Sequence, residues 1–477
     1  MRCIKLHENE KVPVFKNVIY ALRLVCKADK RLLISYLISY IFDDIFVRYI
    51  QSILFLKVLL SLFDRGAEFR EYVRDLLLFF AIAAATKIIS WVAAYIRQVA
   101  TKNVLKVLNN MVFQKAISLD VGCYESPEFY DKYQRATLIM SAGYFDIICY
   151  DVALVVSGIV SLMLVIGTVT AISPVYLLFL LPIALVFVIE IYKSKAVYKR
   201  DLEMTGNNRT KAYIQRTVFL KDFSKDMRTS NIFSVMMRRF EAAVAANVKI
   251  LKSYGVKLFL YSIVSSLFSE FIPIIGTYAY AGYKFVKGGS MTVSGFSVVV
   301  SSISTVREAT LDIAEAFDEM TQMALYFQNL KDFFDFEPSI KDGNIQAGEF
   351  ESLEFRNVTF RYPSAKKNTL ENISFKINKG ETVAVVGING AGKSTAVKLM
   401  LRFYDVTDGE ILYNGVNIKE YTLSSLRSAF ATVFQDYKNF AISVYENVMC
   451  HECTEEDKQK AQTALKQAGV WKKTQSL

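Results

Sequence analysis

Cysteine is scarce in this sequence and forms no paired framework. Only six of the 477 residues are cysteines, and their scatter favours a reducing compartment for the soluble part of the chain. Residues before Arg31 carry many basic groups and lack an apolar core long enough for a signal peptide. We therefore expect the N-terminus to stay in the cytoplasm.

Acidic residues are fewer than basic ones, with 46 Asp and Glu against 57 Lys and Arg and a formal net charge of +11. Such an excess can indicate nucleic acid. However, a hydrophobic content of 53% and a mean hydropathy of +0.26 are too apolar for a purely soluble protein. In membrane proteins, surplus Lys and Arg mark cytoplasmic loops that face anionic headgroups. We therefore expect a membrane domain and no nucleic-acid partner.

One long stretch has no charge at all. Val152 to Ile189 lacks any charged residue, and it is nearly twice the ~20 residues that one spanning helix needs. Two spans are predicted there, with a turn between Gly167 and Pro174, because a proline cannot continue the first helix. Less uniform spans, six in all with these two, are expected at Leu32 to Leu60, Leu76 to Ile96, Leu258 to Tyr283 and Met291 to Val306.

Loop charge predicts how these spans are oriented. The segments Arg97 to Arg135 and Lys193 to Lys257 are long and basic, which places them in the cytoplasm by the positive-inside rule. Both are helix-like, so the spanning helices should continue past the bilayer. Ahead of the first span, Phe15 to Cys26 has apolar residues at helical spacing. This predicts either an interfacial helix on the inner leaflet or an ordinary docked surface helix.

Five charged residues fall inside the predicted spans: Asp43, Asp44, Arg48, Lys87 and Glu270. A charge at mid-membrane costs roughly 2.5 to 3.5 kcal/mol on insertion scales, so it is often kept for a cavity or a pathway. The structural alternative is equally open. Asp44 and Arg48 are four residues apart and can pair on one helix face, and Lys87 can reach the interface.

The strongest motif is a phosphate-binding loop. It consists of Gly387, Ile388, Asn389, Gly390, Ala391, Gly392, Lys393 and Ser394, followed by Thr395. Glycines let backbone N–H groups surround phosphates, Lys393 reaches the β and γ oxygens, and Ser394 offers its hydroxyl to Mg²⁺. A buried strand is expected at Thr382 to Val386 and a helix at Ser394 to Phe403, whose N-terminus favours an anion. The motif predicts binding of a nucleoside triphosphate.

From Phe350 onward, alternating strands and turns replace the helical pattern. Strands are expected around Leu353 to Phe360 and Ile373 to Ile377, and Tyr413 to Val416 carries a hairpin signal. We therefore divide the chain into an N-terminal helix at 1–30, a transmembrane domain at 31–336, a linker at 337–349 and a soluble nucleotide-binding domain at 350–477.

Two further runs resemble known motifs around the phosphate-binding loop. Phe360-Arg361-Tyr362-Pro363 is similar to the aromatic loop of ATP-binding cassette (ABC) proteins, and Val433-Phe434-Gln435-Asp436 is similar to their glutamine loop. With the six spans ahead, the chain resembles an ABC exporter half-transporter. The resemblance implies an all-α six-helix transmembrane domain of the type I exporter kind, followed by a partial α/β P-loop domain. Glu125 to Arg135 and, more weakly, Phe219 to Arg228 resemble coupling helices.

The resemblance also implies roles and partners. Tyr362 would stack on adenine, Gln435 would touch Mg²⁺ and the attacking water, and Lys393 would act with Gln435 in ATP hydrolysis. ATP and Mg²⁺ are the expected cofactors. The partner would be a second half-transporter, in a homodimer or a heterodimer, in the lipid of the plasma membrane with the nucleotide-binding domain in the cytoplasm. The cargo would be a small molecule, lipid or peptide, exported rather than imported.

Some expected motifs are missing after Gln435. The sequence contains no Ser-Gly-Gly signature, no apolar strand ending in Asp-Glu and no switch histidine beyond it. We therefore expect an incomplete nucleotide-binding domain that is inactive alone. Two function classes stay open: an ATP-driven transporter, and a membrane fragment or subunit that binds ATP without hydrolysing it. A soluble P-loop kinase or GTPase is disfavoured by the six spans.

Overall fold

The computed structural model describes residues 13–474, except 125–128, 130–132, 134, 135, 138, 141, 142, 288–290, 339, 364, 435 and 436. The chain divides into two compact units. The first comprises Met1–Leu119 and Cys123–Pro338, and the second comprises Asp120–Gly122 and Ser339–Leu477. The boundary between the units falls inside the linker that the sequence predicts at 337–349.

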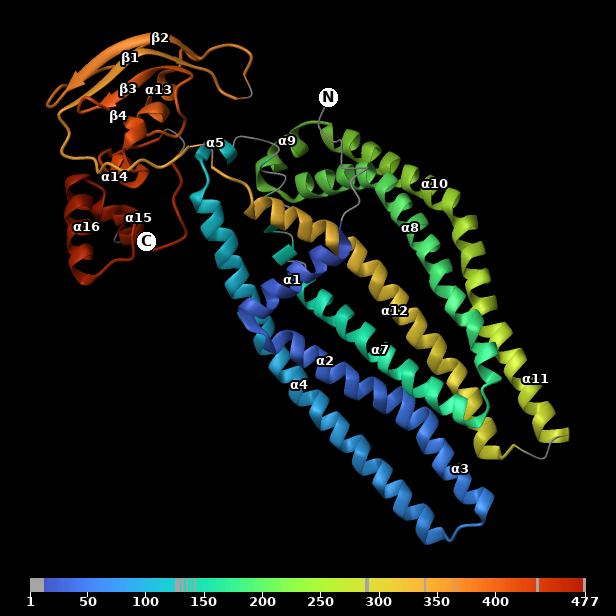
Figure 1. Ribbon diagram of the computed structural model, residues 1–477. Helices are drawn as coiled ribbons and strands as arrows, with labels where there is room; N and C mark the ends of the chain where they lie inside the picture. The colour runs from blue at the N-terminus through green and yellow to red at the C-terminus, as the bar shows by residue number, and fades with distance from the viewer. Residues whose placement is uncertain are drawn as a thin grey trace. The chain divides into compact units, whose positions relative to one another are not determined.

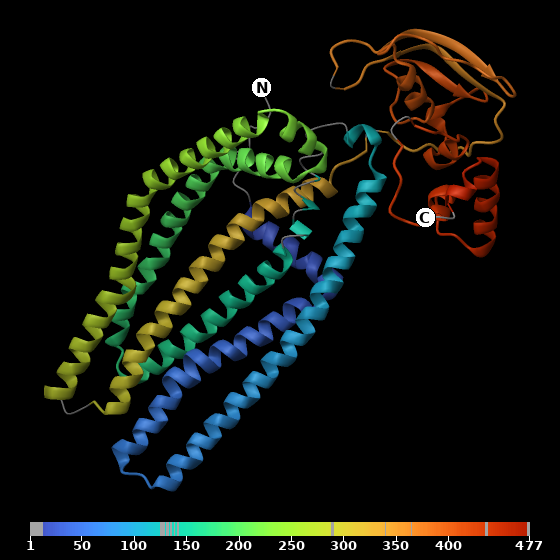
Figure 2. The ribbon, with the colours of Figure 1, turned by 180° about the vertical axis from the view of Figure 1, so that it is seen from behind.

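The first unit is helical, and its long helices pack side by side. Its elements are α1 (Val14–Asp29), α2 (Arg31–Asp44), η1 (Ile45–Phe55), α3 (Leu56–Arg65), α4 (Phe69–Ser118), α7 (Tyr144–Ile172), α8 (Tyr176–Phe219), η2 (Lys221–Phe223), α9 (Ser224–Thr229), α10 (Ile232–Ser266), η3 (Leu267–Phe271), α11 (Ile272–Lys287) and α12 (Val293–Phe334). A short helix, α5 (Val121–Tyr124), follows α4. In Figures 1 and 2, α2 lies along α4, α8 lies along α10, and α7 and α12 run beside each other.

Among the described residues, five helical stretches are long and apolar enough to cross a membrane: Arg31–Arg65, Phe69–Ser118, Tyr144–Ile172, Tyr176–Phe219 and Ile232–Lys287. The two helices predicted in the uncharged stretch are confirmed, but the turn between them is shorter than the predicted Gly167 to Pro174, because α7 continues to Ile172 and α8 begins at Tyr176. The predicted extension of helices into the long basic segments is confirmed too. A sixth helix, α12, begins where the sixth span is expected, but it lies outside these five stretches. That sixth span stays a prediction.

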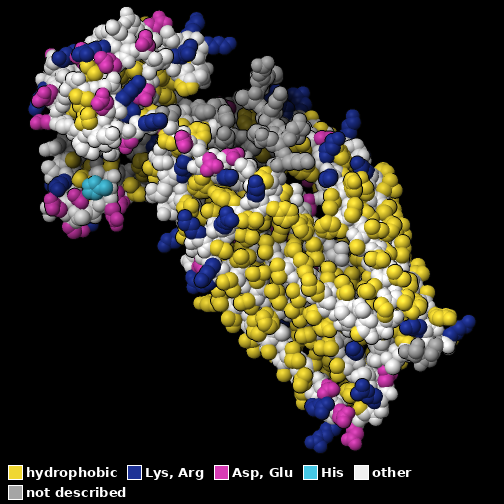
Figure 3. Space-filling view, in the orientation of Figure 1, with side chains coloured by type: hydrophobic (Ala, Val, Ile, Leu, Met, Phe, Trp, Pro, Cys, Tyr) yellow, Lys and Arg dark blue, Asp and Glu magenta, His cyan; other side chains and the backbone are white. Residues whose placement is uncertain are grey.

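Apolar side chains cover much of the outer surface of this unit. Leu77, Phe80 and Trp91 on α4 are 64%, 72% and 69% exposed, and Figure 3 shows a broad hydrophobic band over the long helices with charged side chains gathered at their far end. Such a band is costly in water and natural in lipid, because hydrocarbon takes the place of the missing protein neighbours. The surface supports a membrane location.

Helix α1 docks against the other helices through one face. Val18, Ala21 and Val25 are buried in a core shared with α4, α7 and α12, and the Asn17 side chain donates a 2.9 Å hydrogen bond to the carbonyl oxygen of Ala324. Phe15, by contrast, is 71% exposed. The docked-helix alternative therefore describes one face of α1. Contact of the other face of α1 with the inner leaflet stays a prediction.

The charges inside the predicted spans pair with one another. Asp44 and Arg48 form the expected pair on one helix face, 3.3 Å apart. Instead of only reaching toward the interface, Lys87 donates to Asp43 across two helices at 2.8 Å. Glu270 lies 3.6 Å from Arg307 on α12. The structural alternative, in which these charges pair with other side chains, thus accounts for much of the set of charged residues inside the predicted spans.

The predicted coupling segments differ in how far the structure describes them. Most of Glu125 to Arg135 lies outside the described residues. Phe219 to Arg228 forms the end of α8, the short helix η2 and most of α9. Phe219 is 88% exposed there, so this segment offers an apolar side chain at the surface of the first unit.

The second unit is built on an antiparallel sheet in the order β2-β1-β3-β4. Its strands are β1 (Ser352–Phe360), β2 (Leu370–Asn378), β3 (Asp408–Tyr413) and β4 (Val416–Asn417). The strands predicted around Leu353 to Phe360 and Ile373 to Ile377 are thus confirmed. The predicted hairpin is also confirmed, because Asn414 and Gly415, with φ of 51° and 80°, join β3 to β4. Positive φ at both central residues is what a type I′ turn requires.

Helices complete the second unit. They are α13 (Lys393–Met400), the 3₁₀ turn η4 (Ile418–Glu420), α14 (Leu423–Ser428), α15 (Val444–Met449), α16 (Glu455–Gln467) and α17 (Trp471–Thr474). The core lies between the sheet and α13, where Phe355, Tyr413 and Leu399 are almost fully buried. This packing fixes the start of α13 close to the first residues of β2.

The buried strand predicted at Thr382 to Val386 is wrong. These residues form no strand, and Val383, Val385 and Val386 are 50%, 58% and 90% exposed. A central parallel strand is stabilised by neighbours on both edges and by cover on both faces. Among the described residues, the four strands pair only with one another, so this segment has no strand to pair with. Its apolar sequence was therefore a poor guide to its local structure.

Candidate nucleotide-binding site

The phosphate-binding loop leads directly into α13. Gly390 and Gly392 both have φ of 86°, a left-handed conformation that costs a residue with a Cβ atom about 1 kcal/mol or more. Gly392 is the N-cap of α13, and the N–H of Ala391 donates to the carbonyl oxygen of Ile388 at 3.2 Å. The loop thus curls back on itself at a helix N-terminus, where unpaired N–H groups favour an anion.

Lys393 places its charge over this loop. Its Nζ donates to the carbonyl oxygens of Gly387 at 2.7 Å and Ile388 at 2.9 Å. The ammonium group is therefore held by neutral acceptors and pairs with no carboxylate in these contacts. A phosphate oxygen would be a stronger, charge-assisted acceptor for the same group. The loop is thereby suited to a polyphosphate, and this is the geometry that the sequence motif predicts.

The close approach between loop and sheet explains one glycine. A Cβ atom built on Gly392 would lie 2.6 Å from Cδ2 of Leu370 and 3.1 Å from the carbonyl oxygen of Thr369. Both neighbours belong to the start of β2 and the residue before it. A Cβ at Gly387 would meet only Ala391, at 3.3 Å, and one at Gly390 would meet nothing within 4 Å. Of these three glycines, Gly392 is therefore the one at which neighbouring atoms leave least room for a side chain.

The structure brings Tyr362 to the same helix. Its hydroxyl lies 3.2 Å from the hydroxyl of Thr395, and its ring packs edge-on against Phe360 and Tyr404, with centroids 4.9 and 5.2 Å away. The ammonium of Lys398 lies 5.7 Å from the ring centroid. This contact joins Tyr362 to Thr395, two residues that the sequence assigns to one site, and their roles in nucleotide binding stay predictions.

The other predicted site residues differ in how far solvent reaches their side chains. Ile388 and Ser394 are exposed, Asn389 lies in the exposed part of the loop, and Thr395 is buried at the first turn of α13. Gln435 lies outside the described residues. Its predicted place beside Ser394 at a Mg²⁺ ion is therefore a prediction about the sequence alone.

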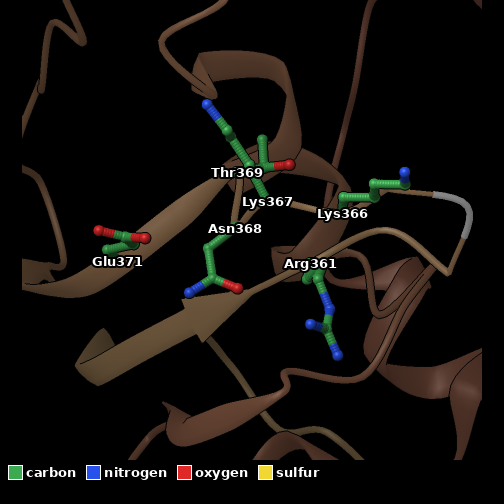
Figure 4. A pocket seen from close by; sticks show the side chains of 6 residues that line it. All are labelled: Arg361, Lys366, Lys367, Asn368, Thr369 and Glu371. Carbon is green, nitrogen blue, oxygen red and sulfur yellow. The ribbon is translucent and has the colours of Figure 1, made fainter.

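An open hollow of about 640 Å³ adjoins the aromatic loop, and it was missed from the sequence. It is lined by Arg361, Lys366, Lys367, Asn368, Thr369 and Glu371. Figure 4 shows these side chains pointing apart, with Lys366 and Lys367 turned away from Arg361. They form no convergent site, but they add positive charge near the loop. The Lys366-Lys367 pair between two predicted strands was the available signal.

Comparisons with known proteins agree with this geometry. Residues 370–477 match the model of the family described as "ABC transporter". The chain is 26% identical over 383 residues to the subtilin transport ATP-binding protein SpaT of Bacillus subtilis, covering 78% of this chain and 61% of that protein. It is 34% identical over 195 residues to the putative multidrug export ATP-binding/permease protein YgaD of Bacillus subtilis, covering 39% and 32%.

Two further likenesses extend this pattern. Over 116 residues the chain is 44% identical to the ATP-dependent lipid A-core flippase of Salmonella typhimurium, covering 24% of this chain and 20% of that protein. Its fold matches a bacterial Atm1-family ABC exporter solved with ATP bound, with a TM-score of 0.62 at 18% identity over 97% of this chain and 78% of the other.

The chain therefore consists of a helical membrane domain followed by an ABC transporter nucleotide-binding domain, and it is homologous to ABC exporters. The predicted family and the coarse fold class are confirmed. The chain spans 61%, 32% and 20% of the length of the three curated relatives named above.

Proposed function

We propose that this chain forms one half of an ATP-driven exporter. The observation that carries the proposal is the glycine loop at the N-terminus of α13, where the Lys393 ammonium sits over carbonyl oxygens that a phosphate would replace. The homology to ABC exporters and the five apolar helical stretches support a transport role. The name of YgaD, a putative multidrug export protein, supports export rather than import.

The residues of the loop suit the triphosphate of ATP. Backbone N–H groups between Gly387 and Thr395 would donate to phosphate oxygens, and Lys393 would neutralise the β and γ groups. Tyr362, fixed beside α13 by its bond to Thr395, would offer a ring face to the adenine, which is worth on the order of 1 to 3 kcal/mol per base. Ser394 and Gln435 are the residues proposed to hold Mg²⁺, which would supply further positive charge to the phosphate groups.

The proposed assembly is a dimer with a second half-transporter, either a copy of this chain or a different one. We place it in the plasma membrane with the nucleotide-binding domain in the cytoplasm, since the long segments Arg97 to Arg135 and Lys193 to Lys257 are basic. Two relatives are named for subtilin transport and for a lipid A-core flippase, and we propose a small molecule, lipid or peptide as the cargo. The alternative function is ATP binding without hydrolysis.

The proposal is tested by photolabelling the purified protein with an ATP analogue. Lys393→Ala should lose most of the labelling, because the charge that compensates the phosphates is gone. Lys419→Ala is the matched control, since Lys419 is an exposed lysine of the same unit, in η4. Equal labelling of the Lys393→Ala variant and the wild type would refute the nucleotide site.

A second measurement separates the two functions. Phosphate release from the 477-residue protein in lipid, lost in Lys393→Ala, supports the ATP-driven transporter. Labelling without any lysine-dependent release would support the alternative, which is ATP binding without hydrolysis. The outcome does not affect the binding proposal itself.

A further inference from the structure

A second hollow, of about 170 Å³, lies at one end of the membrane domain. It is lined by the end of α7, the start of α8, the residues that begin α12, and two lysines, Lys57 on α3 and Lys284 near the end of α11. Figures 1 and 2 show α3, the end of α11 and the start of α12 at the same end of the first unit. Liquid water takes about 30 Å³ per molecule, so this hollow has room for a group the size of a phosphate.

The two lysines bring positive charge to this hollow, and no acidic side chain lines it. Lys57 is exposed and Lys284 is half-buried. In the part of the chain that the structure describes, neither ammonium group pairs with a carboxylate, and Nζ of Lys284 lies 5.4 Å from the centroid of the Tyr280 ring. Two ammonium groups that face one small volume repel each other, and an anion between them would relieve that repulsion.

The N-terminus of α12 adds further positive potential. Ser294 and Gly295 line the hollow and belong to the first turn of this 42-residue helix, where N–H groups carry partial positive charge. The N–H of Gly295 donates to the hydroxyl of Thr292 at 3.1 Å, and the N–H of Ser294 donates to Oδ2 of Asp64 at 3.4 Å. This helix end thus already attracts a carboxylate. The single charge of Asp64 does not balance two lysines and a helix N-terminus.

Hydroxyl groups complete the polar lining. Tyr176, at the start of α8, is 1% exposed, and its hydroxyl donates to the thioether Sδ of Met291 at 3.3 Å. The hydroxyls of Thr292 and Ser294 lie 2.9 Å apart. A thioether is a weak acceptor, and a charged oxygen is a much stronger one for the same donor. Ammonium, hydroxyl and main-chain N–H groups around one small volume suit an oxyanion rather than a cation or an apolar group.

Exposed apolar side chains follow both lysines in the sequence. Val58 on α3 and Phe285 and Val286 on α11 are 37%, 52% and 82% exposed. These residues belong to helical stretches that are apolar enough to cross a membrane. Near the ends of such stretches, lysine side chains extend their ammonium groups to the level of the lipid headgroups. An anion that carries acyl chains can therefore place its charge in the hollow and its chains against the same helices.

We propose that this hollow binds the phosphate group of an anionic phospholipid, held by Lys57, Lys284 and the start of α12. The lipid is a bound component of the membrane domain and not a cargo, so the inference goes beyond the proposed function. Both lysines lie in the first unit, whereas the phosphate-binding loop lies in the second. Inorganic phosphate shares the chemistry of the headgroup. The exposed apolar side chains beside the lysines favour the lipid, and the experiment separates the two sources.

The test measures how fast individual lysines of the full chain are acetylated in lipid nanodiscs, with mass spectrometry as the readout. One set of nanodiscs contains phosphatidylcholine alone, and the other also contains phosphatidylglycerol, which carries a net negative charge. Phosphatidylglycerol should slow the acetylation of Lys57 and Lys284 about tenfold, the factor that about 90% occupancy gives by mass action. This comparison uses the wild-type protein and needs no variant to fold.

Lys287 is the matched control. It is an exposed lysine at the end of α11, it does not line the hollow, and its Nζ lies 5.9 Å from the centroid of the Tyr283 ring, much as Lys284 lies over Tyr280. Its acetylation should slow less than about twofold, the general effect of an anionic surface. In Lys284→Gln, the protection of Lys57 should fall below about twofold, because the phosphate loses one of its two ammonium partners. In Lys287→Gln, Lys57 should keep its protection of about tenfold.

Three results would overturn the proposal. Equal slowing at Lys287 would mean that the lipid acts through the general surface charge. Unchanged protection of Lys57 in Lys284→Gln would mean that the two lysines share no ligand. Inorganic phosphate that slows acetylation in phosphatidylcholine nanodiscs as much as phosphatidylglycerol does would assign the hollow to a free anion. The assay contains no nucleotide, so its result is independent of ATP-analogue labelling at Lys393.

Discussion

The three glycines of the phosphate-binding loop should differ sharply in their tolerance of alanine. At Gly392 two costs combine. A φ of 86° is rarely adopted by residues with a side chain, and the added Cβ would lie 2.6 Å from the Leu370 side chain and 3.1 Å from the Thr369 carbonyl oxygen. Backbone strain of this kind costs about 1 to 3 kcal/mol, and overpacking costs about as much again.

We therefore expect Gly392→Ala to lower the free energy of unfolding of the second unit by about 2 to 5 kcal/mol. Gly390→Ala has the same φ but meets nothing within 4 Å, so it should cost only the strain, about 1 to 2 kcal/mol. Gly387→Ala meets only Ala391, at 3.3 Å, with no left-handed φ, and should cost less than about 1 kcal/mol. The order of the three is the prediction.

The assay is urea unfolding followed by tryptophan fluorescence. The sequence has two tryptophans, Trp91 in the membrane domain and Trp471 in the second unit, so a Trp91→Phe background reports on the second unit alone. The midpoint should fall furthest for Gly392→Ala and least for Gly387→Ala. Equal midpoints for Gly392→Ala and Gly390→Ala would show that the contact with β2 does not constrain the loop, and the reasoning would be refuted.

The remaining predictions concern a buried arginine and the topology. Arg402 is 2% exposed and donates to a carboxylate and to three main-chain carbonyl oxygens, so Arg402→Met should lower the free energy of unfolding by about 3 kcal/mol in the same assay. The control, Arg356→Met at an exposed arginine, should change the free energy of unfolding by less than about 1 kcal/mol. Similar losses in the two variants would contradict this prediction. In a cysteine-free background, Glu68→Cys and Val175→Cys should react with an impermeant thiol reagent outside intact cells and Lys225→Cys should not; external labelling of the last would overturn the proposed orientation.

Local patterns in the sequence were reliable guides to the fold. The uncharged stretch from Val152 gave both the helices and their turn, because twenty apolar residues leave few alternatives. The Asn414-Gly415 pair predicted its hairpin for an equally local reason, since few residues accept positive φ. Thr382 to Val386 failed because a central strand is defined by its neighbours rather than by its own apolar residues. The sequence of this segment shows that it is hydrophobic, and hydrophobicity alone does not establish burial.

In the candidate nucleotide-binding site too, some features could be predicted from the sequence and others could not. The loop from Gly387 to Thr395 follows a fixed spacing, so its residues could be identified from the sequence alone. The contact of Gly392 with Leu370 could not, because it joins residues more than twenty positions apart through the packing of α13 on the sheet.

The two π-helical segments that the structure describes, η1 and η3, each form an ion pair with α12. In η1, Arg48 pairs with Asp312, and in η3, Glu270 pairs with Arg307. If α12 slid by one turn, about 5.4 Å, Arg48 would exchange Asp312 for Glu308 and keep an acidic partner. The same slide would replace Arg307 with Ile303 opposite Glu270 and leave that carboxylate unpaired. In the direction that brings Glu308 to Arg48, the Arg48 pair alone would permit the slide, and of the two ion pairs it is the one between Glu270 and Arg307 that opposes it.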